Sequence, residues 1–245
     1  MKISYPIRIN KYLALNNYST RTGGDELIKK GLVFINDKKA VLGDQVYEND
    51  EIVVKSKGPK KEYAYFAYNK NVNISTNKDN TSKDILSVTK FPVQVFPIGR
   101  LDKDSHGLII MTNDGRVTDR LLSPKYIHEK EYVVKLEKTY SDTFLSLLQN
   151  GVHFDGFISK KCKAWRALLA KNKAGSGESK DTFHIILTEG KKRQIRRMCE
   201  ALHHEVTDLK RIRILNIKLE KIPLGDFREI RGQELNEFLK LLNLI

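Results

Sequence analysis

The chain has 245 residues, 40% of them apolar, and its 44 Lys and Arg against 30 Asp and Glu give a formal net charge of +14. This apolar content is sufficient for a folded core, which excludes a wholly disordered chain. No apolar run approaches the ~20 residues of a membrane-spanning helix, and the first residues lack a secretion signal, so we expect a cytoplasmic protein with no membrane partner. The positive surplus predicts a polyanionic partner, most commonly nucleic acid, although a basic surface that only aids solubility is the simpler alternative.

The cysteines and histidines do not form a metal-binding pattern. Cys162 and Cys199 do not have the spacing of a zinc site, and two cysteines cannot form a disulfide framework. His203 and His204 are adjacent, so on a helix their side chains point about 100° apart and cannot chelate one ion as an i, i+4 pair does. The sequence therefore predicts no metal site.

A charged stretch from Lys55 to Lys61 interrupts the hydrophobic pattern and is typical of a linker. It divides the chain into an N-terminal module, residues 1–58, and a larger domain, residues 62–245. Both parts are basic, so the positive charge is not confined to a tail.

The N-terminal module is predicted to contain two short helices followed by strands. Apolar residues at helical spacing predict a helix around residues 9–13, and Thr22–Asp25 is typical of the start of a second helix that ends near Gly31. Val33–Ile35 and the two turn residues after it predict a hairpin, and residues 50–55 predict a closing strand.

The larger domain is predicted to be rich in strands. Aromatic or alternating apolar residues predict strands at 63–68, 108–111, 131–136 and 182–187. The polar segments 69–84 and 170–181 are typical of loops. Because strands dominate, with a few helices between them, we expect an α+β fold with a mainly antiparallel mixed sheet flanked by helices and loops.

A helix predicted to begin near Lys192 has two distinct faces. Its apolar face is formed by residues at i, i+3, i+4 and i+7, which are Ile195, Met198, Cys199 and Leu202. A second face at the same kind of spacing holds three arginines, Arg193, Arg196 and Arg197. Guanidinium groups near a helix N-terminus favour an anion, which predicts phosphate or carboxylate binding, and a solvated basic face is the alternative.

The segment from Pro97 to Leu108 contains two acids beside two cations. If the segment is extended, Arg100, Asp102 and Asp104 share one face. A carboxylate close to a cation stays ionised and can act as a nucleophile or a base. The simpler alternative is a turn with surface ion pairs.

Three segments, in order along the chain, resemble the motifs of RNA pseudouridine synthases of the RsuA branch. They are Gly99–Leu108, similar to the catalytic motif, His128–Val134, similar to the tyrosine motif, and Leu187–Met198, similar to the third motif. Residues 8–54 resemble an S4 RNA-binding domain. Within the branch, three segments resemble the RluF-like subgroup most closely. They are Val95–Asp102, Lys160–Lys163 and Ile222–Arg228. The resemblance covers nearly the whole chain, and three ordered motifs are more specific than any one alone.

The resemblance implies which residues perform the chemistry. Asp102 is the expected nucleophile, Tyr132 is expected to stack on the uracil and assist removal of the proton from C5, and Lys191 is the expected basic partner that keeps Asp102 ionised. The reaction breaks the N–C glycosidic bond and forms a C–C bond to the same sugar, so it needs no cofactor. Attack of Asp102 on the sugar C1′, attack on the uracil C6 and deprotonation of C2′ all remain open.

The same resemblance implies which residues contact RNA. The substrate-binding residues are expected to be Arg100, which would extrude the base or hold its phosphate, Leu187, which would pack under the base, and Arg193 and Arg196. The RNA-binding residues of the S4-like module are expected to be Arg8, Lys11, Arg21, Lys29 and Lys30.

Two segments depart from the usual family pattern. Asn69–Asn73 stands where relatives usually have a Lys-Pro-x-Gly segment, which implies a differently shaped loop. Thr22–Gly24 replaces a basic-acidic stretch of the S4 helix, which bears on RNA contacts and not on the chemistry.

The predicted function is therefore isomerisation of uridine to pseudouridine in RNA, with the target base flipped into the site. The expected partner is large-subunit (23S) ribosomal RNA near the peptidyl-transferase centre, with a tRNA anticodon uridine as a second substrate, and the protein is expected to be a monomer. A non-catalytic RNA-binding ribosome-assembly factor is the alternative, which would keep the basic faces without needing Asp102. A DNA-binding regulator is disfavoured because the sequence has no helix-turn-helix signal.

Overall fold

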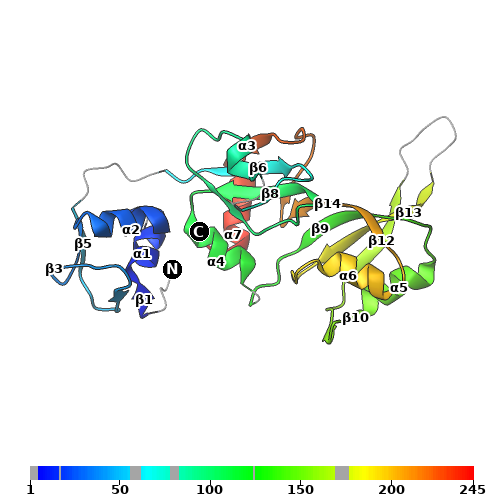
Figure 1. The fold of residues 1–245 in the computed structure, drawn as a ribbon, viewed down its shortest axis with the longest axis horizontal. Coiled ribbons are helices and arrows are strands. Elements are labelled where there is room, and N and C mark those ends of the chain that lie inside the picture. The colour runs from blue at the N-terminus through cyan, green and yellow to red at the C-terminus, as the bar shows by residue number, and fades with distance from the viewer. Residues whose placement is uncertain (1–4, 17, 56–61, 78–82, 124, 169–176) are drawn as a thin grey trace.

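The computed structural model describes residues 5–16, 18–55, 62–77, 83–123, 125–168 and 177–245. The predicted linker falls mostly on residues 56–61, which lie outside the described residues, as does part of the predicted loop at 170–181. Figure 1 shows an N-terminal unit, coloured blue, beside a larger unit built around one long sheet. Within the described part of the chain, no helix has both the length and the apolar character needed to cross a membrane.

The N-terminal unit packs two helices against small antiparallel sheets. Its elements are β1 (Ile7–Arg8), α1 (Ile9–Leu15), α2 (Arg21–Lys29), β2 (Val33–Ile35), β3 (Lys38–Lys39), β4 (Gln45–Val46) and β5 (Ile52–Val54). The strand order β3-β2-β5 confirms the predicted hairpin and closing strand. Asn36 and Asp37 connect the hairpin with φ angles of 48° and 66°, the left-handed pair that a tight two-residue turn requires.

The second helix begins earlier than its glycines suggest. α2 starts at Arg21, because the Thr20 hydroxyl caps it by accepting the Gly23 N–H at 3.0 Å. The two glycines therefore lie inside the helix, where glycine is normally unfavourable. Gly24 is buried, and a Cβ there would lie 3.4 Å from the Cα of Asn10, so its missing side chain lets α2 approach α1 closely.

The larger unit is built on a nine-stranded sheet. Its elements are β6 (Tyr65–Lys70), α3 (Ile85–Val88), β7 (Phe96–Ile98), β8 (His106–Thr112), α4 (Gly115–Leu122), β9 (Lys130–Leu136), α5 (Asp142–Asn150), β10 (His153–Phe154), β11 (Phe157–Ile158), β12 (Lys163–Leu168), β13 (Glu178–Leu187), α6 (Gln194–Ala201), β14 (Val206–Ile214), β15 (Ile217–Lys218), β16 (Phe227–Glu229) and α7 (Gly232–Leu241). The main strand order is β12-β13-β9-β14-β8-β6-β16, with β15 beside β14 and β7 beside β8. Among these described strands every pair is antiparallel except β14 with β8, which confirms the predicted mainly antiparallel mixed sheet.

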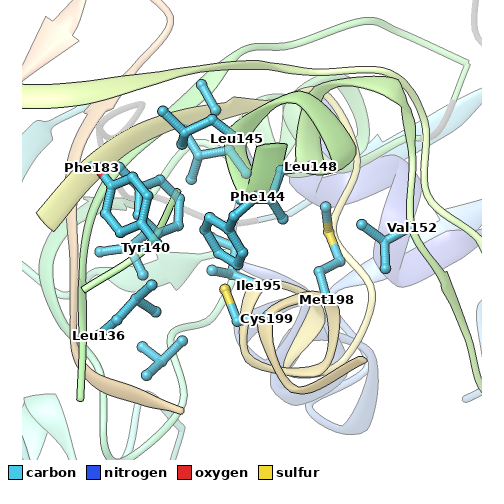
Figure 2. Close-up of a cluster of buried hydrophobic side chains, with 14 of the residues drawn as sticks. Leu136, Tyr140, Phe144, Leu145, Leu148, Val152, Phe183, Ile195, Met198 and Cys199 are labelled. Carbon is cyan, nitrogen blue, oxygen red and sulfur yellow. The ribbon is translucent and has the colours of Figure 1, made fainter. Parts of the chain in front are cut away.

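One apolar cluster joins α5 and α6 to the strands β9, β12, β13 and β14, and we call it the α5/α6 cluster. Figure 2 shows Phe144 and Leu148 of α5 meeting Ile195 and Met198 of α6, with Phe183 of β13 at the sheet side. These side chains are at most 4% exposed. The predicted apolar face of the helix after Lys192 is thereby confirmed.

Two further clusters lie on opposite faces of β6 and β8. Leu108 and Ile110 face α4 and α7 in the α4/α7 cluster, whereas Ile109 and Met111 face α3 in the α3 cluster, as strand alternation requires. Tyr132 packs against both the α3 cluster and the α5/α6 cluster. These two clusters therefore share one face of the long sheet, with Tyr132 between them.

Several predicted boundaries were wrong by a few residues. β6 runs to Lys70, so the polar loop begins two residues later than predicted, and β13 begins at Glu178, inside the predicted loop. Arg193 precedes α6 as a left-handed N-cap residue with a φ of 52° and is not part of the helix.

Candidate active site

Four neighbouring strands place a row of residues across the parallel junction of the sheet. Lys70 on β6 pairs with Gly107 on β8, and Arg211 on β14 pairs with Gly107 on one side and with Tyr132 of β9 on the other. Directly paired residues point to the same face, which is the face of the α3 and α5/α6 clusters. A Cβ on Gly107 would lie 2.3 Å from the Arg211 carbonyl oxygen, so this position requires glycine.

The loop between β7 and β8 contains Asp102 and is held along its whole backbone. Each of the six carbonyl oxygens from Arg100 to Ser105 accepts a hydrogen bond. In chain order of the carbonyls, the donors are Arg211 Nη1 (3.5 Å), Thr76 Oγ1 (2.8 Å), the Ser105 N–H (3.1 Å), the Asn73 N–H (2.7 Å), Arg196 Nη2 (3.0 Å) and Lys70 Nζ (2.7 Å). Such a loop holds its side chains in a fixed geometry before substrate arrives.

Of the two alternatives for the segment that contains Asp102, the structure shows the turn. The Ser105 N–H bonds back to the Asp102 carbonyl at 3.1 Å, so Arg100, Asp102 and Asp104 do not share one face of a strand. The turn is closed locally by Ser105, and distant residues such as Asn73 and Lys70 then hold its carbonyls.

The two acids of the turn have different surroundings. Asp104 Oδ2 lies 2.9 Å from Arg193 Nη1 and 3.3 Å from Arg196 Nε. Partial burial opposes ionisation of Asp104, but the Arg193 hydrogen bond and the charges of both arginines hold its pKa below the usual value. The half-buried Asp102 carboxylate makes no hydrogen bond or ion pair with any residue that the structure describes. Asp102 is therefore the acid available to a substrate.

An apolar wall lies beside Asp102. Leu101, its neighbour, belongs to the α3 cluster that Tyr132 contacts. Leu187 is 3% exposed in the α5/α6 cluster and pairs with Lys130, two residues before Tyr132 on the same strand face. The structure thus places Tyr132 and Leu187 on the face that holds Asp102, a surrounding that suits a flat uracil ring.

The predicted basic partner of Asp102 is directed elsewhere in this structure. Lys191 is exposed, forms no ion pair with Asp102, and its ammonium lies 4.6 Å from the centre of the Phe157 ring. Arg100 is exposed at the start of the Asp102 loop, on the rim of the site. The catalytic role of Lys191 and the base-extruding role of Arg100 stay predictions.

The three arginines near α6 do not form one cluster. Arg193 and Arg196 converge on Asp104, whereas Arg197 pairs with Asp155 and lies over the ring of Phe154. All three arginines therefore pair with carboxylates of this chain, Asp104 for Arg193 and Arg196 and Asp155 for Arg197. Arg193 and Arg196 remain close to the Asp102 loop, so their predicted contact with RNA is compatible with their position.

Lys70 is a component of the site that the sequence did not indicate. It is fully buried and donates to the carbonyls of Ser105 at 2.7 Å and Asn71 at 2.8 Å. Burial lowers the pKa of its ammonium to about 8, against the opposing charges of Asp104 and Asp102. Lys70 lies in the segment that departs from the family pattern, where we predicted only a loop of altered shape.

The predicted RNA-binding residues of the N-terminal unit divide into two groups. Lys11 on α1 pairs with Asp119 of α4 at 3.1 Å, and Lys29 pairs with Glu26 at 3.0 Å. The exposed residues Arg8, Arg21 and Lys30 form no ion pair with a described residue.

Across the described ranges, no group of three His, Cys, Asp or Glu side chains is arranged to hold a metal ion.

Comparison with known proteins agrees with this geometry. A family model described as RNA pseudouridylate synthase matches residues 53–201. The chain belongs to this family, and it is an enzyme that isomerises uridine to pseudouridine in RNA. A crystal structure of a pseudouridylate synthase superposes with a TM-score of 0.66 at 26% identity, covering 94% of this chain and 99% of the other.

Individual relatives show which branch of the family this chain resembles. The dual-specificity RNA pseudouridine synthases RluF of Salmonella typhi and of Escherichia coli strain K12 are each 39% identical, over 240 and 243 residues, which is 96% of this chain and 79% of each relative. Ribosomal large subunit pseudouridine synthase B of Bacillus subtilis strain 168 is 33% identical over 239 residues, 96% of both chains. The resemblance to the RsuA branch and its RluF-like subgroup is confirmed.

Proposed function

We propose that this enzyme isomerises a uridine of large-subunit ribosomal RNA near the peptidyl-transferase centre, with a tRNA anticodon uridine as a second substrate and Asp102 as the nucleophile. The relatives support the choice of RNA, since one is named for the large ribosomal subunit and RluF for dual specificity. The observation that supports the nucleophile is the Asp102 carboxylate, which has no partner among the described residues although its loop is anchored at every carbonyl. The same proposal places the enzyme in the cytoplasm as a monomer.

The proposed chemistry uses few groups. Asp102 attacks the flipped nucleotide at C1′ or C6, or deprotonates C2′, and the N1–C1′ bond breaks. The detached uracil stays between Tyr132 and Leu187 while it rotates, because the apolar wall excludes water that would otherwise release it. C5 then bonds to C1′. On the three routes, respectively, Asp102 is displaced from C1′, is released from C6, or returns the proton to C2′. Tyr132 assists loss of the C5 proton and N1 gains a proton, so atoms and charge balance.

A non-catalytic assembly factor fits this site less well. Such a factor needs basic surface to bind RNA, but it has no use for a carboxylate without a partner among the described residues, on a loop whose carbonyls from Arg100 to Ser105 are all held. Holding the loop of that carboxylate in one geometry is useful where the carboxylate reacts.

The target is tested by tritium release from RNA labelled at uridine C5. We expect the protein to release about one equivalent of tritium from 23S transcripts, a smaller amount from tRNA transcripts with an anticodon-loop uridine, and none from 16S transcripts. Loss of the same pseudouridine from ribosomal RNA of cells that lack the gene would locate the nucleotide. Release from 16S RNA alone would contradict the proposed substrate.

We further propose that residues 1–58 form an S4 RNA-binding domain and residues 62–245 the synthase domain. Arg8, Arg21 and Lys30 are exposed and unpaired among described residues, so they are the side chains best placed to meet phosphates. Lys11 is the weakest candidate, because Asp119 already neutralises it.

The proposed S4 domain is tested by the salt dependence of binding. Replacing Arg8, Arg21 and Lys30 by Gln should weaken RNA binding and lower the slope of log K against log salt by about 2 to 3, since each phosphate contact contributes about 0.7 to 0.9. The matched control removes three exposed charges elsewhere, with Lys218, Lys221 and Lys240 each changed to Gln. Equal slopes for the two triple variants would show that the N-terminal unit contributes no specific phosphate contacts.

A further inference from the structure

Arg211 is a buried cation without a counter-ion. Its side chain is 3% exposed, and it forms no ion pair with a described carboxylate. Its Nε donates to the Leu108 carbonyl at 2.7 Å and its Nη1 to the Arg100 carbonyl at a longer 3.5 Å, while its buried Nη2 has no hydrogen-bond partner among the described residues. A buried, unpaired charge is unfavourable for folding, so its presence calls for a reason other than stability.

The position of Arg211 is set by an irregularity in β14. Arg211 pairs with Tyr132 and Arg213 pairs with Glu131, and the pairing register shifts between the two arginines. Because Tyr132 and Glu131 are consecutive on β9 and point to opposite faces, the two arginines also point to opposite faces. Arg211 is thereby turned toward the Asp102 loop, whereas Arg213 pairs with Glu131 at 2.8 Å on the other side.

The contacts of Arg211 connect the beginning of the Asp102 loop to β8, the strand that follows the loop. Its guanidinium spans two carbonyls, Leu108 at the start of β8 and Arg100 two residues before Asp102. Lys70 provides the matching contact at the end of the loop, on the Ser105 carbonyl at 2.7 Å. The two cations therefore hold the loop from both ends, and their charges lie on the same face of the sheet as the acid.

We propose that Arg211 is a positioning residue, which fixes the backbone of the Asp102 loop in its reactive geometry and supplies buried positive charge to that face without an ion pair to Asp102. This inference rests on the proposed assignment of Asp102 as the nucleophile. The planar fork of a guanidinium donates in fixed directions from several nitrogen atoms, whereas a Lys ammonium donates from a single nitrogen atom.

The test compares Arg211→Met and Arg211→Lys with a matched control, Arg213→Met, on the same strand. For Arg211→Met we expect a single-turnover rate of tritium release lower by about 100-fold, with the dissociation constant for RNA unchanged, since misplacing a reacting group by about 1 Å has that effect. Arg211→Lys should recover part of the rate, because it keeps the charge and loses the fork. Arg213→Met should keep the wild-type rate.

Melting and hydrogen exchange separate positioning from a structural role. The melting temperature of Arg211→Met should equal or exceed that of the wild type, because a buried charge without a described counter-ion has been removed. Arg213→Met should melt lower, because Glu131 and Glu129 both lose their ion pair with Arg213. Amide exchange at residues 100–105 should be faster in Arg211→Met and unchanged in Arg213→Met.

Each outcome decides the inference. A wild-type rate in Arg211→Met, or a lower rate that accompanies a lower melting temperature without local exchange at 100–105, would overturn it. If Asp102→Asn remained active, the proposed nucleophile would fail whatever Arg211 did. If Asp102→Asn were inactive and Arg211→Met fully active, only the positioning role would fail.

Discussion

Asp102→Asn is expected to abolish tritium release, with a single-turnover rate at least about 1000-fold below that of the wild type. The amide has the shape of the carboxylate but is not a nucleophile or a base. The loop contacts described for residues 100–105 involve the backbone, so the variant should keep its fold. Its melting temperature and its affinity for RNA should therefore equal those of the wild type.

Asp104→Asn is the matched control, two residues along the same turn. It weakens the ion pairs to Arg193 and Arg196, so we expect a moderate loss of rate, about 10-fold, from a loosened loop. Because the pKa of Asp104 is held below its usual value, the loss of this pair should also lower stability at neutral pH. A larger rate loss in Asp104→Asn than in Asp102→Asn would exchange the roles of the two acids.

Arg196→Met is expected to lower the single-turnover rate by about 100-fold, whereas Lys191→Met should lower it less than about 3-fold. Arg196 is 13% exposed, donates to the carbonyls of Asp104 at 3.0 Å and Val206 at 2.6 Å, and so links α6, β14 and the Asp102 loop. Lys191 is exposed and contacts the Phe157 ring.

This pair of variants separates two assignments of the basic partner. The family resemblance implies that Lys191 is the basic partner of Asp102. The geometry favours Arg196, which contacts the loop that carries Asp102. Melting curves of both variants show whether a lost rate reflects lost fold, and Arg196→Lys provides a milder change with the charge retained. A severe loss in Lys191→Met with Arg196→Met near wild type would favour the resemblance and would mean that Lys191 turns toward Asp102 when RNA binds.

Elements with a strong local period were predictable from the sequence. The helix that contains Ile195 and Met198 follows the 3.6-residue period and is buried as predicted, and β8 was found through its apolar run. β14 escaped because Lys210, Arg211 and Arg213 interrupt its apolar residues and its register shifts twice, so neither face alternates cleanly.

The site was predictable only in part, because its geometry depends on distant partners. Motifs brought Asp102, Tyr132 and Leu187 into consideration, and the structure places them on one face of the sheet. The turn at residues 102–105 is closed by the Ser105 N–H, but its loop is anchored by Thr76 at the Leu101 carbonyl and by Asn73 at the Lys103 carbonyl. Thr76 and Asn73 lie in the segment that was predicted to be a polar loop. The local pattern left a turn and an extended segment both open, and it could not reveal the distant donors that anchor the turn.

The order of the strands also sets when the Asp102 loop can be fully anchored. β14 lies between β9 and β8, which do not pair with each other, so among the described strands it is the only bridge between the two halves of the sheet. Yet β14 begins at Val206, late in the chain. During synthesis the halves can gather their own strands early, but residues 206–214 must leave the ribosome before the Asp102 loop gains the donor that reaches the Arg100 carbonyl. The anchoring of the Asp102 loop therefore cannot be complete until residues 206–214 have been synthesised.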